Sequence, residues 1–245
     1  NGGTDLTETN IAATDQATDT PTNNFCTMNP LHFGISGTQA MTEGNLKGLG
    51  GTANAGIGCT IAFTKGKWYF EGRIGGTPSN GGAGIGVGED TFNANTSTFY
   101  GYDSKIVCIQ GYRQRLYCGG SSYDIGGTST HMANTDIVMF AIDYDEDFIY
   151  VGRNGTWYNS GDPTSGSSGT GNINKSEYGG IGTFTMANKF IMPVQATQGT
   201  TDYPEMNFGS PFYANSSDAA DANGYGAFEY APPSGYFALC TKNLA

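Results

Sequence analysis

The sequence predicts an all-β protein, on three observations of composition and spacing. Leu, a strong helix former, occurs only seven times in 245 residues, whereas Thr occurs 29 times, and this balance favours strands. The apolar bulk comes instead from 15 Tyr and 14 Phe residues. Turn signals built on Gly, Asn and Pro recur about every 8–12 residues, the spacing of a β-sandwich or barrel. Although Gly is abundant at 39 residues, the aromatic content of 13% and the modest net charge of −11 argue against disorder.

The predicted strands alternate apolar and polar side chains or carry unbroken apolar runs. In the strand at 68–74, Trp68, Phe70, Gly72 and Ile74 share one face, with Tyr69, Glu71 and Arg73 on the other. The strand at 137–143 is apolar on both faces, which predicts a central strand covered on both sides. Asn154-Gly155 is the best hairpin turn of the chain, since both residues tolerate positive φ. In order, the predicted strands are 58–64, 68–74, 83–88, 137–143, 148–153, 190–196, 202–208 and 236–239.

The polar segments between and before these strands predict loops and an arm. Residues 1–24 are rich in Thr, Asn, Asp and Gly and predict an extended N-terminal arm, with the sandwich domain at 25–245. Residues 160–180 and 213–227 lack apolar anchors and predict surface loops. The chain starts at Asn1 rather than Met, which is typical of a processed chain or of a piece of a longer protein.

The acidic balance excludes several classes of function. With a pI of about 4.4 and 11 scattered Lys and Arg residues, no basic patch can neutralise phosphate, so we expect no nucleic-acid partner. No run of about 18 apolar residues occurs, so we expect no membrane insertion. Two His residues and no CxxC pair argue against a zinc site. We expect no cofactor.

The acidic run Asp143, Asp145 and Asp147 leaves three interpretations open. A solvated acidic turn is favoured. On one strand face, however, three carboxylates would suit Ca²⁺, or the acid and nucleophile of a sandwich-fold glycanase. The five cysteines are too few for a disulfide scaffold. Cys26 and Cys240 begin similar phrases, Cys-Thr-Met-Asn and Cys-Thr-Lys-Asn, which suggests that the first and last strands lie side by side and makes these two the candidate disulfide pair.

A segment rich in Tyr and Arg is the candidate binding surface. Tyr and Arg dominate binding hot spots, and tyrosine rings also stack on sugars. Trp157, after the Asn-Gly turn, either caps the sandwich or faces a ligand, and capping is favoured. The other candidate ligand-binding residues are Tyr100, Tyr102, Tyr112, Arg113, Arg115, Tyr117 and Tyr123.

Three phrases, taken together and in order, resemble a SPRY domain. The first is the strand phrase Gly-Lys-Trp-Tyr-Phe-Glu at 66–71. The second is 84–88, Gly-Ile-Gly-Val-Gly, with Tyr-Gly-Tyr-Asp-Ser at 100–104. The third is the hairpin from Asp136 through Asp143 and 148–150 to Asn154-Gly155. The resemblance covers about residues 25–244 and implies a two-sheet antiparallel sandwich of the concanavalin-like jelly-roll type.

A narrower resemblance points to SPRY domains of structural proteins in tailed phages, especially those of aquatic phages. It is carried by residues 20–30, by Asn154 to Trp157 with the loop at 160–166, and by the ending at 232–241. This resemblance implies a non-catalytic module on a virion surface, as a fibre, capsid decoration or tail-tip part, that is a homo-oligomer or lattice-bound. Its loops would bind a host-surface glycan or protein, and its arm would contact other virion proteins. The alternatives are a purely structural virion protein and a glycan-degrading sandwich enzyme.

Overall fold

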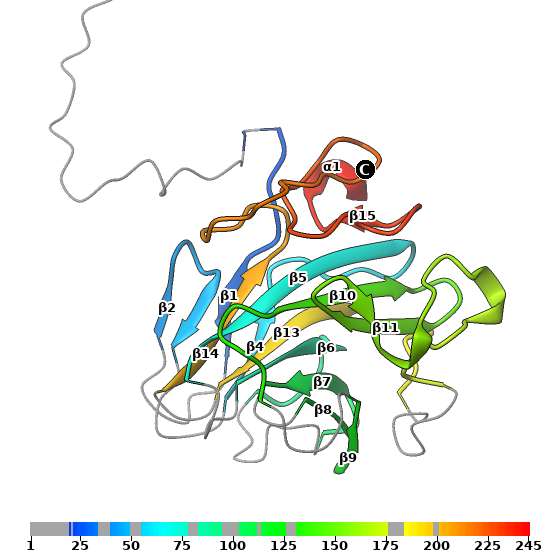
Figure 1. Cartoon of the computed structure of the whole chain (residues 1–245), viewed down its shortest axis with the longest axis horizontal. Helices are drawn as coiled ribbons and strands as arrows, with labels where there is room; N and C mark the ends of the chain where they lie inside the picture. Colours follow the sequence, from blue (N-terminus) through cyan, green and yellow to red (C-terminus); the bar gives the residue numbers. More distant parts are fainter. Residues whose placement is uncertain are drawn as a thin grey trace, which may run out of the picture.

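Two β-sheets face each other in the structure (Figure 1). The computed structural model describes residues 20, 22–33, 40–49, 55–77, 83–94, 103–111, 114–125, 131–175, 184–197 and 201–245. Within these residues the chain is nearly all β, so the predicted fold class is confirmed. The helices in the described part are short: η2 (Tyr158–Ser160), η3 (Gly166–Ser168) and α1 (Thr241–Leu244).

Among the strands that the structure describes, all pairs but one are antiparallel. The seven-stranded sheet has the order β1 (Met28–Phe33), β4 (Ala55–Cys59), β13 (Ile191–Thr197), β6 (Gly84–Glu89), β7 (Ile106–Gln110), β8 (Arg115–Cys118) and β9 (Ser121–Asp124). The eight-stranded sheet has the order β12 (Thr156–Trp157), β11 (Phe148–Arg153), β10 (Ile137–Asp143), β5 (Lys67–Gly76), β14 (Asp202–Asn207), β3 (Lys47–Leu49) and β2 (Ala40–Thr42). The eighth strand of this sheet is β15 (Phe237–Ala238). It pairs with β5 outside the order just given and is the exception, because it runs parallel to β5.

The main core lies between the sheets and contains aromatic and β-branched side chains from both. Phe70 of β5 and Phe140 of β10 are cross-strand partners, and their rings stack 5.0 Å apart at 4°. Ile85 and Val87 of β6 are fully buried in the same cluster. Tyr and Phe thus supply the buried area that Leu supplies in other chains.

A second core lies on the other face of the eight-stranded sheet, under residues 209–240, which we call the C-terminal cover. Tyr69 of β5 packs edge-on against Phe228 of the cover, with ring centroids 5.0 Å apart. Figure 1 shows β15 and α1 stacked beyond β5 on this side. Strand β10 is fully buried because one core covers each of its faces, which confirms the doubly covered strand predicted at 137–143.

Buried carboxylates fasten the cover to the sheet. Glu71 of β5 accepts hydrogen bonds from the backbone N–H groups of Glu229 and Tyr230, at 2.9 and 2.8 Å. Asp221, within the cover, accepts from the N–H of Ala238 and from Asn243 Nδ2. The predicted surface loop at 213–227 is confirmed, since this segment has no helix or strand and is mostly exposed, but it does contain an apolar anchor, the buried Tyr213 of the second core.

The other predicted segments agree with the structure to different extents. Predicted strands 137–143 and 148–153 coincide with β10 and β11, and 68–74, 83–88, 190–196 and 202–208 lie within one residue or two of β5, β6, β13 and β14. The strand predicted at 58–64 is wrong in its second half, because β4 ends at Cys59 and Phe63 forms only an isolated bridge to Ile191. The loop predicted at 160–180, described as far as residue 175, does contain an apolar anchor, the buried Ile173.

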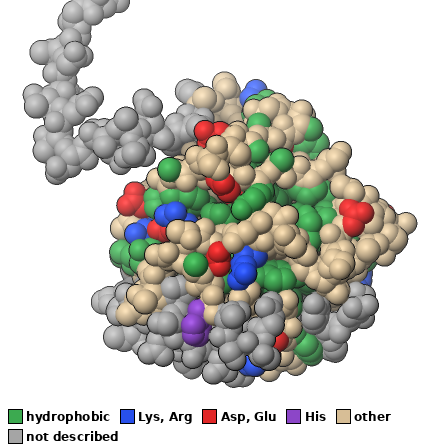
Figure 2. Space-filling view, in the orientation of Figure 1, with side chains coloured by type: hydrophobic (Ala, Val, Ile, Leu, Met, Phe, Trp, Pro, Cys, Tyr) green, Lys and Arg blue, Asp and Glu red, His purple; other side chains and the backbone are tan. Residues whose placement is uncertain are grey.

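The boundary between arm and domain stays a prediction, because most of residues 1–24 lie outside the described part. Asn24 already contacts the end of the chain, where its N–H donates to Thr241 Oγ1 at 3.0 Å. Acidic and basic side chains are dispersed over the face shown in Figure 2 rather than gathered in one patch. Within the described ranges, no helix has the length and apolar character needed to cross a bilayer.

Candidate functional site

The hairpin of β8 and β9 holds the described part of the predicted Tyr- and Arg-rich surface. Arg115 and Tyr117 lie on β8, and Tyr123 lies on β9. The other four predicted residues of this segment, Tyr100, Tyr102, Tyr112 and Arg113, lie outside the described residues.

Strand register separates the three described residues onto two faces. Leu116 pairs with Tyr123 and Arg115 with Asp124, so Arg115, Tyr117 and Asp124 share the face opposite to Leu116. Leu116 belongs to the main core, and Tyr117 and Tyr123 are both partly buried against that core, so the strand register alone separates the two tyrosines. Of the three predicted residues, Arg115 and Tyr117 therefore lie on one face of the sheet and Tyr123 lies on the other.

Side-chain bonds hold the first face in a defined geometry, and we call Arg115, Tyr117 and Asp124, with Gln110 behind them, the hairpin site. The Arg115 guanidinium pairs with both Asp124 carboxylate oxygens, Nε with Oδ1 and Nη2 with Oδ2, the latter at 3.2 Å. This pairing raises the pKa of Arg115. The Tyr117 hydroxyl donates to Gln110 Oε1 at 3.0 Å. An exposed ion pair contributes little to stability, but its two-point geometry orients the guanidinium plane.

Tyr158 supports the base of the hairpin and is a residue that the sequence reasoning missed. Its hydroxyl donates to Oε1 of the buried Gln114, at 3.1 Å, next to the start of β8. Burial raises the pKa of Tyr158 to about 12, so the hydroxyl keeps its proton at neutral pH. No local signal predicts this contact, because Tyr158 follows β12 of the other sheet.

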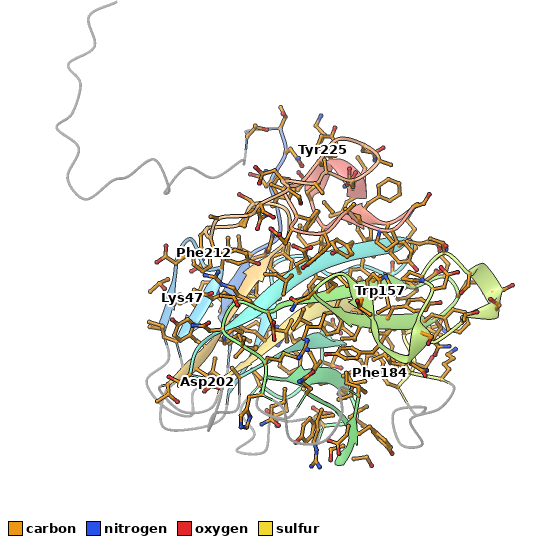
Figure 3. All side chains as sticks on the ribbon, viewed as in Figure 1. Lys47, Trp157, Phe184, Asp202, Phe212 and Tyr225 are labelled. Carbon is orange, nitrogen blue, oxygen red and sulfur yellow. The ribbon has the colours of Figure 1, made fainter. Side chains whose placement is uncertain are left out.

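Trp157 caps the eight-stranded sheet, in agreement with the favoured interpretation. It lies on the edge strand β12 beside the second core (Figure 3). A Cβ atom added to Gly152 would lie 3.0 Å from the Trp157 ring and 2.5 Å from Met139 Cε, so glycine makes room for the indole. Trp157 is therefore not part of the hairpin site.

The three aspartates at 143, 145 and 147 do not share a face, and each has a different partner. Asp143 is buried and pairs with Lys67 Nζ at 2.6 Å. Asp145 is exposed and accepts from the Gly66 N–H at 3.0 Å. Asp147 has φ +60°, accepts from the Met186 N–H at 2.7 Å and pairs with Lys175 at 2.6 Å.

This arrangement changes two of the interpretations of the acidic run. In the described ranges, no three side chains of the His, Cys, Asp or Glu type gather into a metal cluster, so the predicted Ca²⁺ ligand set is not assembled. The solvated turn is correct for Asp145 and wrong for Asp143 and Asp147, which are buried. The physical reason is that β10 ends at Asp143 and the chain reverses, which points the three carboxylates in different directions.

The first and last segments of the domain do lie side by side, but the predicted disulfide is absent. Phe25 forms a bridge with Cys240, and the Cys26 N–H donates to the Leu239 carbonyl at 2.9 Å. All five cysteines are buried and none is in a disulfide. Cys26 instead contacts Cys59, whose thiol pKa is raised by burial and by this neighbour.

Comparison with known proteins identifies the fold. The chain matches no family model and no curated protein. Among solved structures it is similar to the SPRY domain of human HERC1, with a TM-score of 0.53 and 12% identity over 73% of this chain and 96% of that one. It is also similar to the PSpry domain of TRIM65, with a TM-score of 0.51 and 10% identity over 75% of this chain and 89% of that one. The chain therefore has a SPRY-like β-sandwich fold.

Proposed function

We propose that this protein is a non-catalytic binding domain that recognises its target through the hairpin site. The observation that carries the proposal is that the Arg115 guanidinium and the Tyr117 ring lie on one face of the hairpin. Asp124 orients the guanidinium and Gln110 holds the tyrosine hydroxyl, so both groups are ordered before any ligand binds. Side chains that are already ordered lose less conformational entropy on binding. The SPRY-like fold supports this proposal, since both similar structures are named as SPRY-type domains.

The chemistry of the hairpin site suits a glycan or a polar protein surface. A tyrosine ring offers an apolar face for stacking, and the guanidinium offers donors for hydroxyl or carboxylate groups. The charged groups that a glycosidase would use are occupied, because Asp143 and Asp147 pair with Lys67 and Lys175. These ion pairs support a non-catalytic role over the glycan-degrading alternative.

We place this binding domain on the surface of a tailed-phage virion, where it recognises a host-surface glycan or protein. The phrases at 20–30, 154–157 and 232–241 support this placement through their resemblance to phage SPRY domains. The proposed role of residues 1–24 is attachment to other virion proteins.

A binding assay on a glycan array and on whole cells tests the proposal. Tyr117→Ala and Arg115→Ala are expected to reduce binding about tenfold or more, the range of hot-spot side chains. Tyr225→Ala is the matched control, because Tyr225 lies beside β15 and α1, at the other end of the molecule from β8 and β9 (Figure 3). Full binding by both hairpin variants would contradict the proposal, and binding to virion subunits alone would favour the structural alternative.

A further inference from the structure

Three large apolar side chains are more than one third exposed in the described part of the chain. They are Leu31 at 93%, Phe190 at 57% and Leu244 at 40%. Phe190 and Leu244 line the same groove, and Leu31 stands on a separate projection. Exposed apolar side chains that cluster around a hollow mark an interaction surface.

The groove has a volume of about 610 Å³ and an aromatic interior. Phe63 and Trp68 are buried at its base, and Phe237 of β15 lies beside Trp68 through the pairing of β15 with β5. Trp68 Nε1 donates to the Lys65 carbonyl at 2.8 Å, so the polar atom of the indole is satisfied within the chain. A ligand therefore meets chiefly apolar surface, to which the exposed Phe190 and the half-buried Phe237 contribute.

The backbone holds the walls of the groove in place. The Phe190 carbonyl accepts from the Asp90 N–H at 3.0 Å, and the neighbouring Ile191 exchanges two hydrogen bonds with Phe63. Leu244 ends α1, where the N–H of Asn243 donates to the Cys240 carbonyl at 3.1 Å. The groove is thus preformed rather than created by a ligand.

Leu31 is presented by a bulge on edge strand β1. Met28 pairs with Cys59 and Phe33 with Ile57, so four residues of β1, 29–32, stand opposite the single residue Gly58 of β4. The Leu31 N–H donates to Asn29 Oδ1 at 2.9 Å, which closes a tight turn under the side chain. We call residues 29–32 the Leu31 bulge.

The base of the Leu31 bulge is anchored by His32. The His32 ring stacks on Phe92 with centroids 4.7 Å apart, and a Cβ atom on Gly58 would lie 2.6 Å from His32 Nδ1. Glycine at this position therefore makes the seat for the imidazole. A leucine held on an anchored turn is a rigid apolar knob rather than a loose surface residue.

We propose that the Leu31 bulge of one copy docks in the aromatic groove of a second copy. Charge favours this occupant: the segment Met28–Phe33 has no Asp, Glu, Lys or Arg, while the chain as a whole carries −11. The groove matches it, because the exposed Lys65 and Asp145 of its lining have opposite signs and its third charged side chain, Lys67, is paired with Asp143. An uncharged knob can approach a balanced groove, whereas most other surfaces of two acidic copies repel.

A contact between two different patches is heterologous and joins copies into rings or open chains. One inserted bulge covers much less than the roughly 1,200 Å² of a small stable interface. The association is therefore weak for two isolated copies and becomes strong when many copies are held together in an array. The groove lies beside β15 and α1, away from β8 and β9 (Figure 1), so this inference does not depend on the hairpin site.

Cysteine cross-linking between two tagged variants tests this contact. All five native cysteines are buried, so Leu31→Cys and Phe190→Cys each add one accessible thiol. On oxidation of the mixture, we expect the mixed disulfide at a yield roughly tenfold above that of Leu31→Cys with Thr156→Cys, a matched exposed position on β12, because docking holds the two thiols close together. Lys65→Cys, at the rim of the groove, replaces Phe190→Cys if the latter fails to fold.

A second measurement uses the wild-type chain. Its sedimentation at high concentration is expected to show oligomers that Leu31→Asp removes, while Leu31→Met retains them. The inference would be overturned if the disulfide between Leu31→Cys and Phe190→Cys formed in the same yield as the disulfide between Leu31→Cys and Thr156→Cys. Oligomers that persist unchanged in Leu31→Asp would overturn it as well. Because the target-binding assay uses Tyr117 and Arg115, it reports on the proposed function separately from this contact.

Discussion

We expect Glu71→Ala to loosen the C-terminal cover, because one carboxylate satisfies four donors there. Glu71 Oε1 accepts from the Tyr69 hydroxyl and the Tyr230 N–H, both at 2.8 Å. Its Oε2 accepts from the Glu229 N–H at 2.9 Å and from Asn207 Nδ2 at 3.3 Å. Alanine removes every one of these acceptors while the cover still encloses the donors.

The structure allows the loss to be estimated donor by donor. Asn207 Nδ2 keeps a second acceptor, the Ala227 carbonyl at 3.0 Å, and the Tyr69 hydroxyl can rotate. The two backbone N–H groups belong to half-buried residues and have no second acceptor in the described part, so each loses an amount toward the lower end of the roughly 1–3 kcal/mol of an unsatisfied buried group. Relief from burying a charge offsets part of this sum. We therefore expect the free energy of unfolding to fall by about 3 kcal/mol, within a range of about 2–6 kcal/mol.

Urea denaturation measures this difference directly, with the slope m as a check on two-state behaviour. The melting temperature is expected to fall by about 6–12 °C, since 1 kcal/mol corresponds to about 2–4 °C in a chain of this size. Glu146→Ala, at an exposed position on the acidic turn, is the matched control and should change stability by less than about 0.5 kcal/mol. A loss below about 1 kcal/mol in Glu71→Ala would refute the reasoning.

The pH dependence of Glu71→Gln provides an independent check. Burial raises the pKa of Glu71 above its usual 4.5, although four donors oppose the shift. At pH values between the usual 4.5 and the raised pKa of the folded chain, Glu71 keeps a proton that it has lost in the unfolded chain. The stability of the wild type therefore falls as pH rises through this window. The glutamine side chain of the variant does not titrate, so the stability advantage of the wild type over Glu71→Gln should shrink as pH rises. An advantage that grows would contradict the raised pKa.

Three further substitutions test the core, the β1 bulge and an unpaired carboxylate. Phe140→Ala should lower the free energy of unfolding by about 3–5 kcal/mol in urea denaturation, and a loss below about 2 kcal/mol would indicate that the core collapses around the gap. Gly58→Ala should lower it by about 1–3 kcal/mol by displacing His32, and an unchanged value would show that the imidazole moves aside. Asp202 is buried, and its Oδ2 accepts a hydrogen bond from the Ala83 N–H at 3.1 Å, whereas its Oδ1 has no partner among the described residues. Asp202→Asn should therefore raise the melting temperature at pH 7. This gain should shrink in acid, because the raised pKa of Asp202 lets the wild-type carboxylate bind a proton there. A lower melting temperature of the variant at pH 7 would show that the carboxylate has a favourable role.

Strands with strong local patterns are predictable because the signal lies within a few residues. The segment 137–143 is apolar at six consecutive positions and coincides with β10, and the Asn154-Gly155 turn marks the end of β11, where the chain turns back into β12. In contrast, β2, β3 and β12 are two or three residues long, too short for alternation to be visible. These strands exist because longer neighbours offer them an edge to pair with.

The candidate site was predictable as a segment but not as a surface. Tyr and Arg content predicts the segment 99–123, whereas the register of β8 against β9 decides that Arg115 and Tyr117 share one face while Tyr123 shares the face of the buried Leu116. The support from Tyr158 depends on how two sheets meet, more than 40 positions away in sequence. A composition signal carries no information about such a contact.

Strand positions, hairpin turns and the all-β class follow from the amino-acid order, because backbone preference and alternation are short-range properties. The partners of the acidic side chains follow only from the folded chain. The alternation of β5 places Glu71 on the face away from the main core, yet the C-terminal cover buries it there. Asp143 and Asp147 are also buried, and each pairs with a lysine from a distant position, Lys67 and Lys175. Burial of a charge depends on which distant segment brings donors to it, and only the tertiary packing of strands, loops and the C-terminal cover decides that.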